Sequence, residues 1–136
     1  MNKPKLIAEI GCNHKGDFDI ALKMIEVAAE NGADVVKFQK RNNKELLTEE
    51  EYNTPHPVPH NSYGGGKGYG YHREALEFDI ERHKTLMHHA EDCGVRYSCS
   101  VWDMSSALGM TNVVNPAMIK IPSALATNFE VLQYLA

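Results

Sequence analysis

Short apolar stretches alternate with amphipathic ones along the whole chain. Four apolar stretches bounded by turn residues predict buried strands, at residues 6–10, 35–39, 95–100 and 118–121. Between and after them, apolar residues recur at helical spacing and predict helices. These helices span residues 17–31, 79–93, 105–111 and 128–136. The pattern is therefore a strand followed by a helix, repeated four times.

Capping residues mark several of the predicted helix ends. Asp17 is a suitable N-cap for the first helix, and Gly32 follows its end, where a glycine is common. Gly94 follows the end of the helix predicted at residues 79–93, and Asn128 caps the last helix. Residues 40–72 contain Pro55, Pro57, Pro59 and glycines at 64, 65, 66, 68 and 70, which predict a long irregular loop. Loops of this length are unusual and often functional, and the stretch GGGKGYG (64–70) within it predicts a mobile loop or lid.

Strands that alternate with helices imply a parallel sheet with right-handed crossovers. This α/β pattern fits either a doubly wound sheet or part of a (β/α) barrel. No GxGxxG motif follows the first strand, which disfavours dinucleotide binding. A complete barrel needs about 250 residues, whereas this chain has 136. On the sequence pattern alone, both architectures stay open.

Composition narrows the function classes. The chain of 136 residues suits one compact domain, and 14 basic against 18 acidic residues give a net charge of −4. Nucleic-acid binding would call for a basic patch, so no nucleic-acid partner is expected. No apolar run approaches the roughly 20 residues of a membrane helix, and the start lacks a secretory signal. Three cysteines without metal spacing favour the reducing cytoplasm.

Polar side chains interrupt the apolar strands, each time near the strand's C-terminal end. They are Glu9, Lys37, Gln39, Ser98, Ser100 and Lys120. In a barrel, inward side chains at that end form the active-site mouth. A buried lysine needs an anionic partner, which is either an internal carboxylate, as in a Glu9–Lys37 ion pair, or a bound anion. Two lysines on different strands with serines between them favour a bound phosphate or carboxylate.

Other polar features carry weaker signals. Ser123, just beyond the fourth strand, is either a phosphate ligand or an ordinary turn serine, and the first loop, CNHKG, is equally ambiguous. The histidines at 83, 88 and 89 predict a solvated helix face rather than a metal site, because their spacing does not place them together. The stretch GGGKGYG lacks the P-loop pattern.

Five segments, in this order and spacing, together resemble the N-terminal half of the sialic acid (N-acetylneuraminate) synthase family. They are IAEIGCNHKGD (7–17), GADVVKFQ (32–39), YGYHREALEF (69–78), YSCSVWD (97–103) and IKIPSA (119–124). The resemblance implies a parallel barrel of TIM type, of which residues 1–136 supply the first four βα units. It also implies condensation of phosphoenolpyruvate with N-acetylmannosamine or a related amino sugar, which forms a nonulosonic acid and releases phosphate.

The resemblance also assigns roles to individual residues. Lys37, Ser100, Lys120 and Ser123 are the expected phosphoenolpyruvate ligands, and Glu9 is the expected catalytic carboxylate. Further candidates for substrate contacts are Asn13, His14, Gln39 and Arg73. In the family, carbon 3 of phosphoenolpyruvate attacks the sugar aldehyde, which a divalent metal, Mn or Mg, polarises.

Two departures from the family pattern shape the expectations. Leu125 occupies a position where some relatives carry a glutamate. The family's metal-binding histidines and its C-terminal antifreeze-like domain, which completes the site in a homodimer, lie beyond residue 136. We therefore expect a fragment that is inactive alone. The alternatives are a different barrel enzyme, such as an aldolase or a pterin-binding synthase, and a non-catalytic half-barrel that acts as a binding or assembly module.

Overall fold

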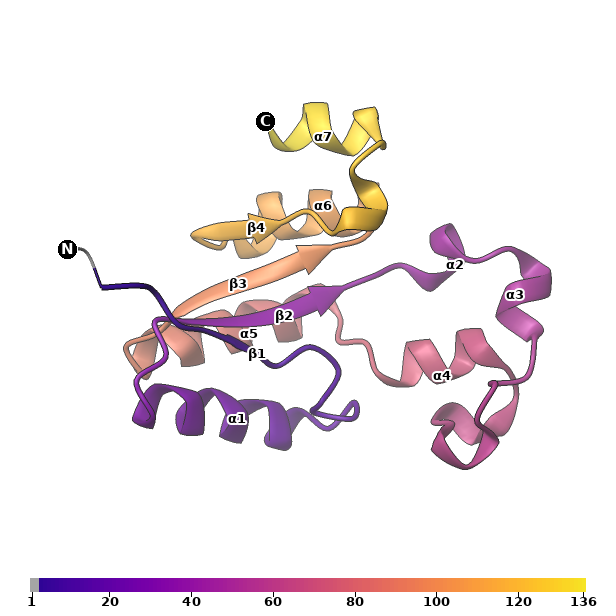
Figure 1. The fold of residues 1–136 in the computed structure, drawn as a ribbon, viewed down its shortest axis with the longest axis horizontal. Coiled ribbons are helices and arrows are strands. Elements are labelled where there is room, and N and C mark those ends of the chain that lie inside the picture. Colours follow the sequence, from indigo (N-terminus) through magenta and orange to yellow (C-terminus); the bar gives the residue numbers. More distant parts are fainter. Residues whose placement is uncertain (1–2) are drawn as a thin grey trace.

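The computed structural model describes residues 3–136 as four successive βα units (Figure 1). The strands are β1 (Ile7–Glu9), β2 (Val35–Lys40), β3 (Arg96–Val101) and β4 (Met118–Lys120). They form one sheet in the order β1-β2-β3-β4, and every neighbouring pair is parallel. The predicted sequential parallel sheet is confirmed.

The register of the sheet decides which side chains share a face. Glu9 pairs with Lys37, Lys37 with Ser98, and Ser98 with Met118. Side chains alternate along a strand, and in-register partners point to the same side. One face, called the open face below, therefore carries Glu9, Lys37, Gln39, Ser98, Ser100 and Lys120. The opposite, helix-covered face carries Ala8, Val36, Phe38, Tyr97, Cys99, Val101 and Ile119.

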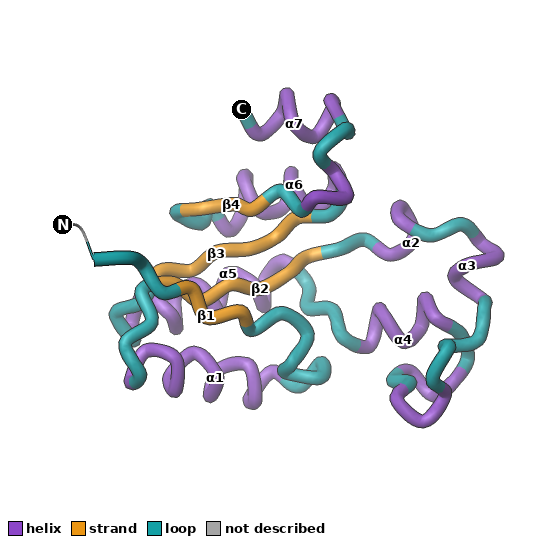
Figure 2. Tube along the Cα trace, viewed as in Figure 1, coloured by secondary structure: helices purple, strands orange, loops and turns teal. Residues whose placement is uncertain are grey.

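Helices pack against the helix-covered face of the sheet. Helices α1 (Phe18–Glu30), α5 (Ile80–Asp92) and α6 (Met104–Gly109) lie beside the sheet in Figure 2, while α7 (Phe129–Leu135) follows β4. Their apolar stripes complete the core with the strands, and each fully buried large side chain contributes about 1.5–3 kcal/mol. The buried helix residues include Ala21, Ile25, Leu86, Ala90, Ala107 and Val131.

The predicted helix caps at Asp17 and Asn128 are confirmed. The Asp17 carboxylate accepts a hydrogen bond from the Ile20 amide at 3.0 Å, and the Asn128 side chain accepts one from the Val131 amide at 3.2 Å. Gly32 has a φ of 80°, the left-handed conformation that a glycine after a helix adopts without strain.

The prediction of an irregular chain over residues 40–72 is wrong. This segment contains α2 (Asn43–Leu46), α3 (Glu49–Asn53), two 3₁₀ turns (Pro59–Asn61 and Gly64–Gly66) and the start of α4 (Tyr69–Ala75). Helix α3 has a reciprocal capping box, in which Thr48 caps the Glu51 amide and the Glu51 side chain accepts from the Thr48 amide. Such local bonds stabilise short helices despite the flanking prolines and glycines.

The helix predicted at residues 105–111 begins earlier and ends later. Asp103 caps α6 by accepting from the Ser106 amide at 2.7 Å, so the helix starts at Met104. It continues as a π-helical turn over Met110–Val114, which ends at Asn115 in the left-handed conformation. Within residues 3–136, no helix combines the length and the apolar character needed to cross a membrane.

His83 does not lie on a solvated helix face, contrary to the sequence-based prediction. It is buried, and its Nδ1 lies 2.6 Å from the Tyr97 hydroxyl, between the edges of Phe38 and Phe78. Burial lowers the pKa of His83 to about 3. His88, on the same helix, is exposed as predicted. The histidine therefore serves the core as a neutral aromatic ring with one polar partner.

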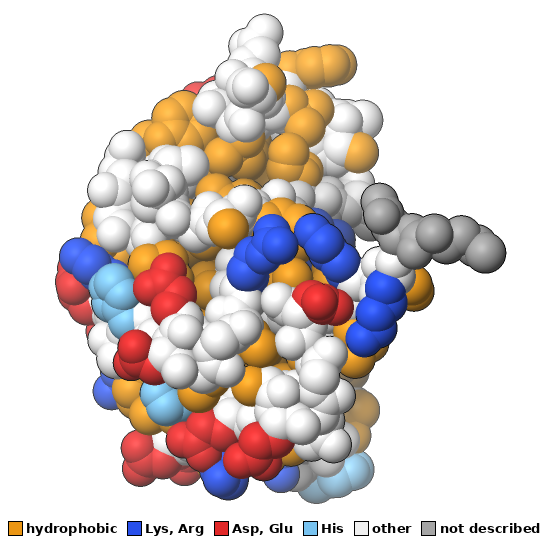
Figure 3. Space-filling view, turned by 90° about the vertical axis from the view of Figure 1, so that its left-hand side faces the viewer, with side chains coloured by type: hydrophobic (Ala, Val, Ile, Leu, Met, Phe, Trp, Pro, Cys, Tyr) orange, Lys and Arg blue, Asp and Glu red, His pale blue; other side chains and the backbone are white. Residues whose placement is uncertain are grey.

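Exposed apolar side chains gather around the last two βα elements. Figure 3 looks at the end of the sheet where the strands begin, with hydrophobic side chains in its upper part and many charged ones in its lower part. The exposed apolar residues near β4, α6 and α7 include Leu108, Met118, Phe129 and Tyr134. Among the large apolar side chains of residues 3–136, Phe129 is the most exposed, at 73%.

Candidate functional site

A hollow of about 510 Å³ lies on the open face of the sheet. Its polar lining consists of Glu9 from β1, Lys37 from β2 and Lys120 from β4. Its apolar lining consists of Ile7, Met118, Ile119 and Ile121. We call it the inner hollow. Three of the predicted site residues, from three different strands, therefore surround one space.

Lys37 forms two side-chain hydrogen bonds at the inner hollow. Its ammonium group donates to the Glu9 carboxylate and to the Ser100 hydroxyl, the latter at 3.2 Å. The Lys37 side chain is only 12% exposed, whereas that of Glu9 is 52% exposed. The internal ion pair that the sequence left open as an alternative is thus formed. Lys120 is exposed, and within residues 3–136 it forms no ion pair.

Gly11 brings the first loop close to this pair. Its φ of 48° is left-handed, and a Cβ at this position would stand 2.9 Å from Gln39 Nε2 and 3.4 Å from Glu9 Oε1. Any other residue would be strained there and would crowd both side chains. The glycine therefore leaves a small gap where a Cβ would be, with the Gln39 amide and the Glu9 carboxylate next to it.

Arg41, which the sequence-based reasoning missed, connects this region to the rim of the sheet. Its guanidinium donates to the side-chain oxygen of Gln39 and lies 3.5 Å from the Glu77 carboxylate. It also lies over the Trp102 ring, at 4.9 Å from the centroid. Arg41 is buried. The signal was its position, because 37, 39 and 41 continue the period-two alternation of the open face beyond the end of the strand.

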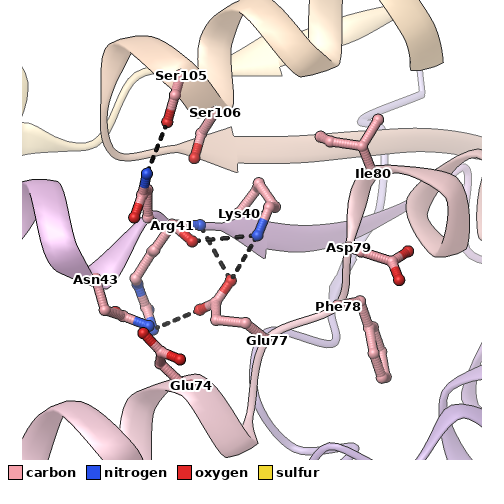
Figure 4. Close-up of a pocket in the computed structure, with 11 residues that line it drawn as sticks. Lys40, Arg41, Asn43, Glu74, Glu77, Phe78, Asp79, Ile80, Ser105 and Ser106 are labelled. Carbon is pink, nitrogen blue, oxygen red and sulfur yellow. Dashed lines mark hydrogen bonds and ion pairs between the residues drawn. The ribbon is translucent and has the colours of Figure 1, made fainter.

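A second hollow of about 440 Å³, the rim hollow, lies between the end of β2, the segment before α5 and the start of α6 (Figure 4). Glu77 is at its centre, with Lys40 Nζ at 3.7 Å and the Arg41 guanidinium on its other oxygen. Burial raises the pKa of Glu77, although Lys40 and Arg41 act in the opposite direction. Two cations around one buried carboxylate reduce the cost of burying all three charges.

Asp103 orders the other wall of the rim hollow. Its carboxylate accepts from the Asn42 amide at 2.7 Å and from the Ser105 hydroxyl at 2.9 Å, in addition to capping α6. The Asn42 side chain in turn donates to the Ser105 hydroxyl at 3.2 Å. The loops that follow β2 and β3 are therefore tied together at the C-terminal edge of the sheet.

The other predicted site residues lie apart from the inner hollow. Ser123 begins a 3₁₀ turn after β4, where it is exposed and does not line the inner hollow. Asn13 is exposed in the first loop. His14 is buried, its ring is stacked on Phe78 at 4.4 Å, and burial lowers its pKa. Arg73 lies on α4, over the Tyr69 ring. Leu125 is buried in the core.

Residues 3–136 contain no group of three or more histidine, cysteine, aspartate or glutamate side chains that could hold a metal ion. The described residues therefore do not fit the divalent metal that the resemblance implies, and we assign no step to it.

Comparisons with known proteins identify related sequences. Over 136 residues, the chain is 33% identical to the N,N'-diacetyllegionaminic acid synthase of Campylobacter jejuni, covering 100% of this chain and 40% of that protein. It is 35% identical over 131 residues to the human N-acetylneuraminate-9-phosphate synthase, covering 96% of this chain and 35% of the relative. The chain thus spans less than half the length of these relatives.

A solved structure supports the fold. The crystal structure of the N-acetylneuraminic acid (sialic acid) synthetase from Leptospira borgpetersenii, in complex with citrate, matches with a TM-score of 0.77. The match covers 98% of this chain and 41% of that one, at 24% identity. The four parallel strands with alternating helices correspond to part of a TIM-type barrel. The family model of the NeuB family matches residues 24–136. The chain therefore belongs to the NeuB family, of which it represents an N-terminal portion.

Proposed function

We propose that this chain supplies the phosphoenolpyruvate-binding wall of a synthase that condenses phosphoenolpyruvate with N-acetylmannosamine or a related amino sugar. The observation that carries the proposal is the convergence of Glu9, Lys37 and Lys120 on one hollow, with the Ser100 hydroxyl on Lys37. Membership in the NeuB family supports the same chemistry. The product is a nonulosonic acid, and the second product is inorganic phosphate.

The donor carries a phosphate and a carboxylate, so it needs two cationic contacts. Lys37 and Lys120 stand on β2 and β4, with β3 between them, and both line the inner hollow. Ser100 is on β3, where it pairs in register with Lys120, and its hydroxyl accepts a hydrogen bond from Lys37 at 3.2 Å. We assign the two lysines and Ser100 to the donor. Ser123 lies outside the inner hollow, and its assignment as a further phosphate contact rests on the family resemblance alone.

Glu9 and the donor compete for Lys37 in this proposal. In the structure the ammonium group of Lys37 neutralises Glu9. An arriving anion shares that ammonium, which leaves the charge of the Glu9 carboxylate less fully neutralised beside the reacting carbons. We assign to Glu9 the catalytic role near the aldehyde. Carbon 3 of the donor bonds to the aldehyde carbon as the C2–C3 double bond becomes single, and the aldehyde oxygen becomes a hydroxyl by taking one proton of the water. The water oxygen adds to carbon 2 and becomes the ketone oxygen as the bond from carbon 2 to the phosphate oxygen breaks, and the second water proton leaves with the phosphate.

Anion binding by the chain tests the site directly. We expect calorimetric titration with phosphoenolpyruvate to show weak binding to the wild-type chain. Lys37→Met removes one charge-assisted hydrogen bond and should weaken binding about tenfold or more. Glu9→Gln removes the competing carboxylate and should tighten binding. Lys23→Met, at an exposed lysine that pairs with Glu26 on α1, is the matched control and should change nothing. Equal affinities for all four proteins would contradict the proposed site.

Turnover tests the whole reaction. Phosphate release is measured with phosphoenolpyruvate, N-acetylmannosamine and manganese, with and without a chelator. We expect the 136-residue chain alone to show none, because residues 3–136 present no metal cluster. Chelator-sensitive release by the purified chain would contradict that expectation. Anion binding without turnover by any protein that contains the chain would instead favour a non-catalytic binding module.

A further inference from the structure

We propose that Arg41 is a positioning residue that fixes the orientation of the Gln39 side-chain amide, so that its NH₂ group faces the gap beside Glu9. Arg41 itself lies outside the inner hollow. It acts on the site only through Gln39, which the sequence suggests as a substrate contact. The structural part of the inference stands by itself, and its kinetic part rests on the proposed function.

The orientation follows from hydrogen-bond chemistry. A glutamine amide has an acceptor end and a donor end of nearly equal size, so packing alone does not distinguish its two orientations. A guanidinium group only donates. Arg41 Nη2 donates to Gln39 Oε1, which leaves Gln39 Nε2 at the free end. That nitrogen and Glu9 Oε1 both lie next to the position that a Cβ on Gly11 would occupy.

Arg41 is held firmly enough to act in this way. It is 5% exposed, and Glu77 binds it twice, through the guanidinium at 3.5 Å and through the backbone amide at 3.0 Å. The guanidinium also lies over Trp102 and within 3.6 Å of the Cys12 sulfur. These contacts come from the first loop, the segment before α5 and the end of β3. A guanidinium group that three segments contact is already fixed in position. It therefore loses little further freedom when it binds the Gln39 amide.

The chemical consequence is a fixed donor beside a carboxylate. With Nε2 facing the gap, Gln39 can donate to Glu9 or to a substrate oxygen that enters beside it. With the amide reversed, its oxygen would face the Glu9 carboxylate, and two acceptors would meet without a proton between them. Loss of Arg41 should therefore release the amide to rotate and weaken a substrate contact, without removing any group that touches the substrate.

The amide can be observed directly, because Gln39 and Gln133 are the only glutamines in the chain. In ¹⁵N-labelled protein, Gln39→Leu assigns the Gln39 side-chain resonances, and the exposed Gln133 serves as an internal reference. We expect the Gln39 pair to be shifted away from that of Gln133 in the wild type. In Arg41→Met the shift should be lost, whereas in Lys40→Met, which removes the other cation on Glu77, it should persist.

Arg41→Lys provides the same test if Arg41→Met does not fold, since it keeps a charge beside Glu77. One ammonium group cannot hold the amide and the carboxylate in the arginine's fork geometry, so the Gln39 shift should again be lost. An unchanged Gln39 resonance pair in the folded variant would overturn the proposal. So would an equal loss of shift in Lys40→Met.

A double-mutant cycle in a catalytically active protein that contains this chain gives the kinetic readout. Gln39→Leu and Arg41→Met should each lower kcat/KM for the amino sugar by up to about tenfold, the value of one hydrogen bond between neutral groups. The double variant should lose no more than either single one, because both remove the same contact. Additive losses would show that Arg41 acts elsewhere. If the wild type shows no turnover, the proposed function fails, while the amide resonances still decide the role of Arg41.

Discussion

The two faces of the sheet are built from the same strands, yet they carry opposite chemistry. On the helix-covered face, Val36, Phe38 and Cys99 are fully buried among apolar neighbours. On the open face, their neighbours along the chain include Lys37 and Ser98. Period-two alternation lets one short strand serve both purposes. The helix-covered face provides the stability, and the open face holds the groups to which we assign binding and reaction in the proposed function.

The open face is costly to build, and its contacts show how the cost is reduced. A lysine in the middle of a strand would be strongly unfavourable without a partner. Lys37 has two, Glu9 and Ser100, and the buried Arg41 at the rim has Glu77 and Gln39. Each of these partners is itself polar and within the sheet or its loops. The polar face is therefore a connected network rather than a set of isolated charges.

The largest expected difference between the faces concerns Phe38. Phe38→Ala should lower the free energy of unfolding by about 3–5 kcal/mol, because the ring is fully buried and stacked on Tyr97. Met118→Ala on the open face, where the side chain is 39% exposed, should cost about 1 kcal/mol or less. Urea unfolding followed by circular dichroism measures both. Similar costs would mean that the open face also belongs to the core.

In the rim hollow, substitution of Glu77 should destabilise the protein nearly as much as Phe38→Ala does. Glu77→Ala removes the carboxylate that neutralises Lys40 and Arg41, and leaves a buried guanidinium with fewer partners. Removing one partner of a buried ion pair typically costs about 3 kcal/mol or more. Glu74→Ala, at an exposed residue that lines the same rim hollow, is the control and should cost about 0.5 kcal/mol or less. A small effect of Glu77→Ala in urea unfolding would show that the rim network is solvated.

Much of the sheet was predictable from the sequence, because its signal is local. The four strands and their order follow from apolar stretches separated by helical ones, and the structure has them at residues 7–9, 35–40, 96–101 and 118–120. The inward placement of Lys37 and Lys120 followed from alternation alone. The Glu9–Lys37 pair was open as one of two interpretations, because the sequence does not show whether an ion pair and an anion site coexist.

The remaining features depend on contacts between distant segments. The capping box of Thr48 and Glu51 is the exception, because its TxxE pattern is local and was overlooked among the nearby prolines and glycines. His83 looked solvated because its helix is polar, and only the arrival of Phe38 and Tyr97 from two strands buries it. Arg41 gained its role from Glu77, which is 36 residues away. Long-range partners of this kind leave no pattern at short spacing.

The helix-covered face should also make the stability depend on pH. The pKa of His83 is lowered to about 3 in the folded state by burial, with smaller contributions from Lys40 and His14. The unfolded histidine, with a pKa of 6.5, gains a proton that the folded one does not bind. Stability is therefore lost as the pH falls below 6.5, by about 2 kcal/mol between pH 7 and pH 5. Urea unfolding at several pH values measures the loss.

His83→Gln should remove this part of the pH dependence, because glutamine keeps a polar group for Tyr97 and does not titrate. His88→Gln, at the exposed histidine of the same helix, should leave the dependence unchanged. If the wild type and His83→Gln lose stability in parallel below pH 6.5, His83 is not the group responsible.

The smallest expected effect separates two serines on the open face. Ser98 and Ser100 are two residues apart on β3, and both are buried. The Ser100 hydroxyl accepts from Lys37 at 3.2 Å, whereas the Ser98 Oγ has no hydrogen-bond partner among the residues that the structure describes. Ser100→Ala should cost about 1.5 kcal/mol, the low end for a bond to a charged group. Ser98→Ala removes a buried hydroxyl that forms no bond, so it should be neutral or slightly stabilising. Thermal unfolding compares the two variants. Each removes one hydroxyl group, and the two serines are similarly buried. Equal costs would show that the Lys37–Ser100 contact contributes nothing, and that Lys37 depends on Glu9 alone.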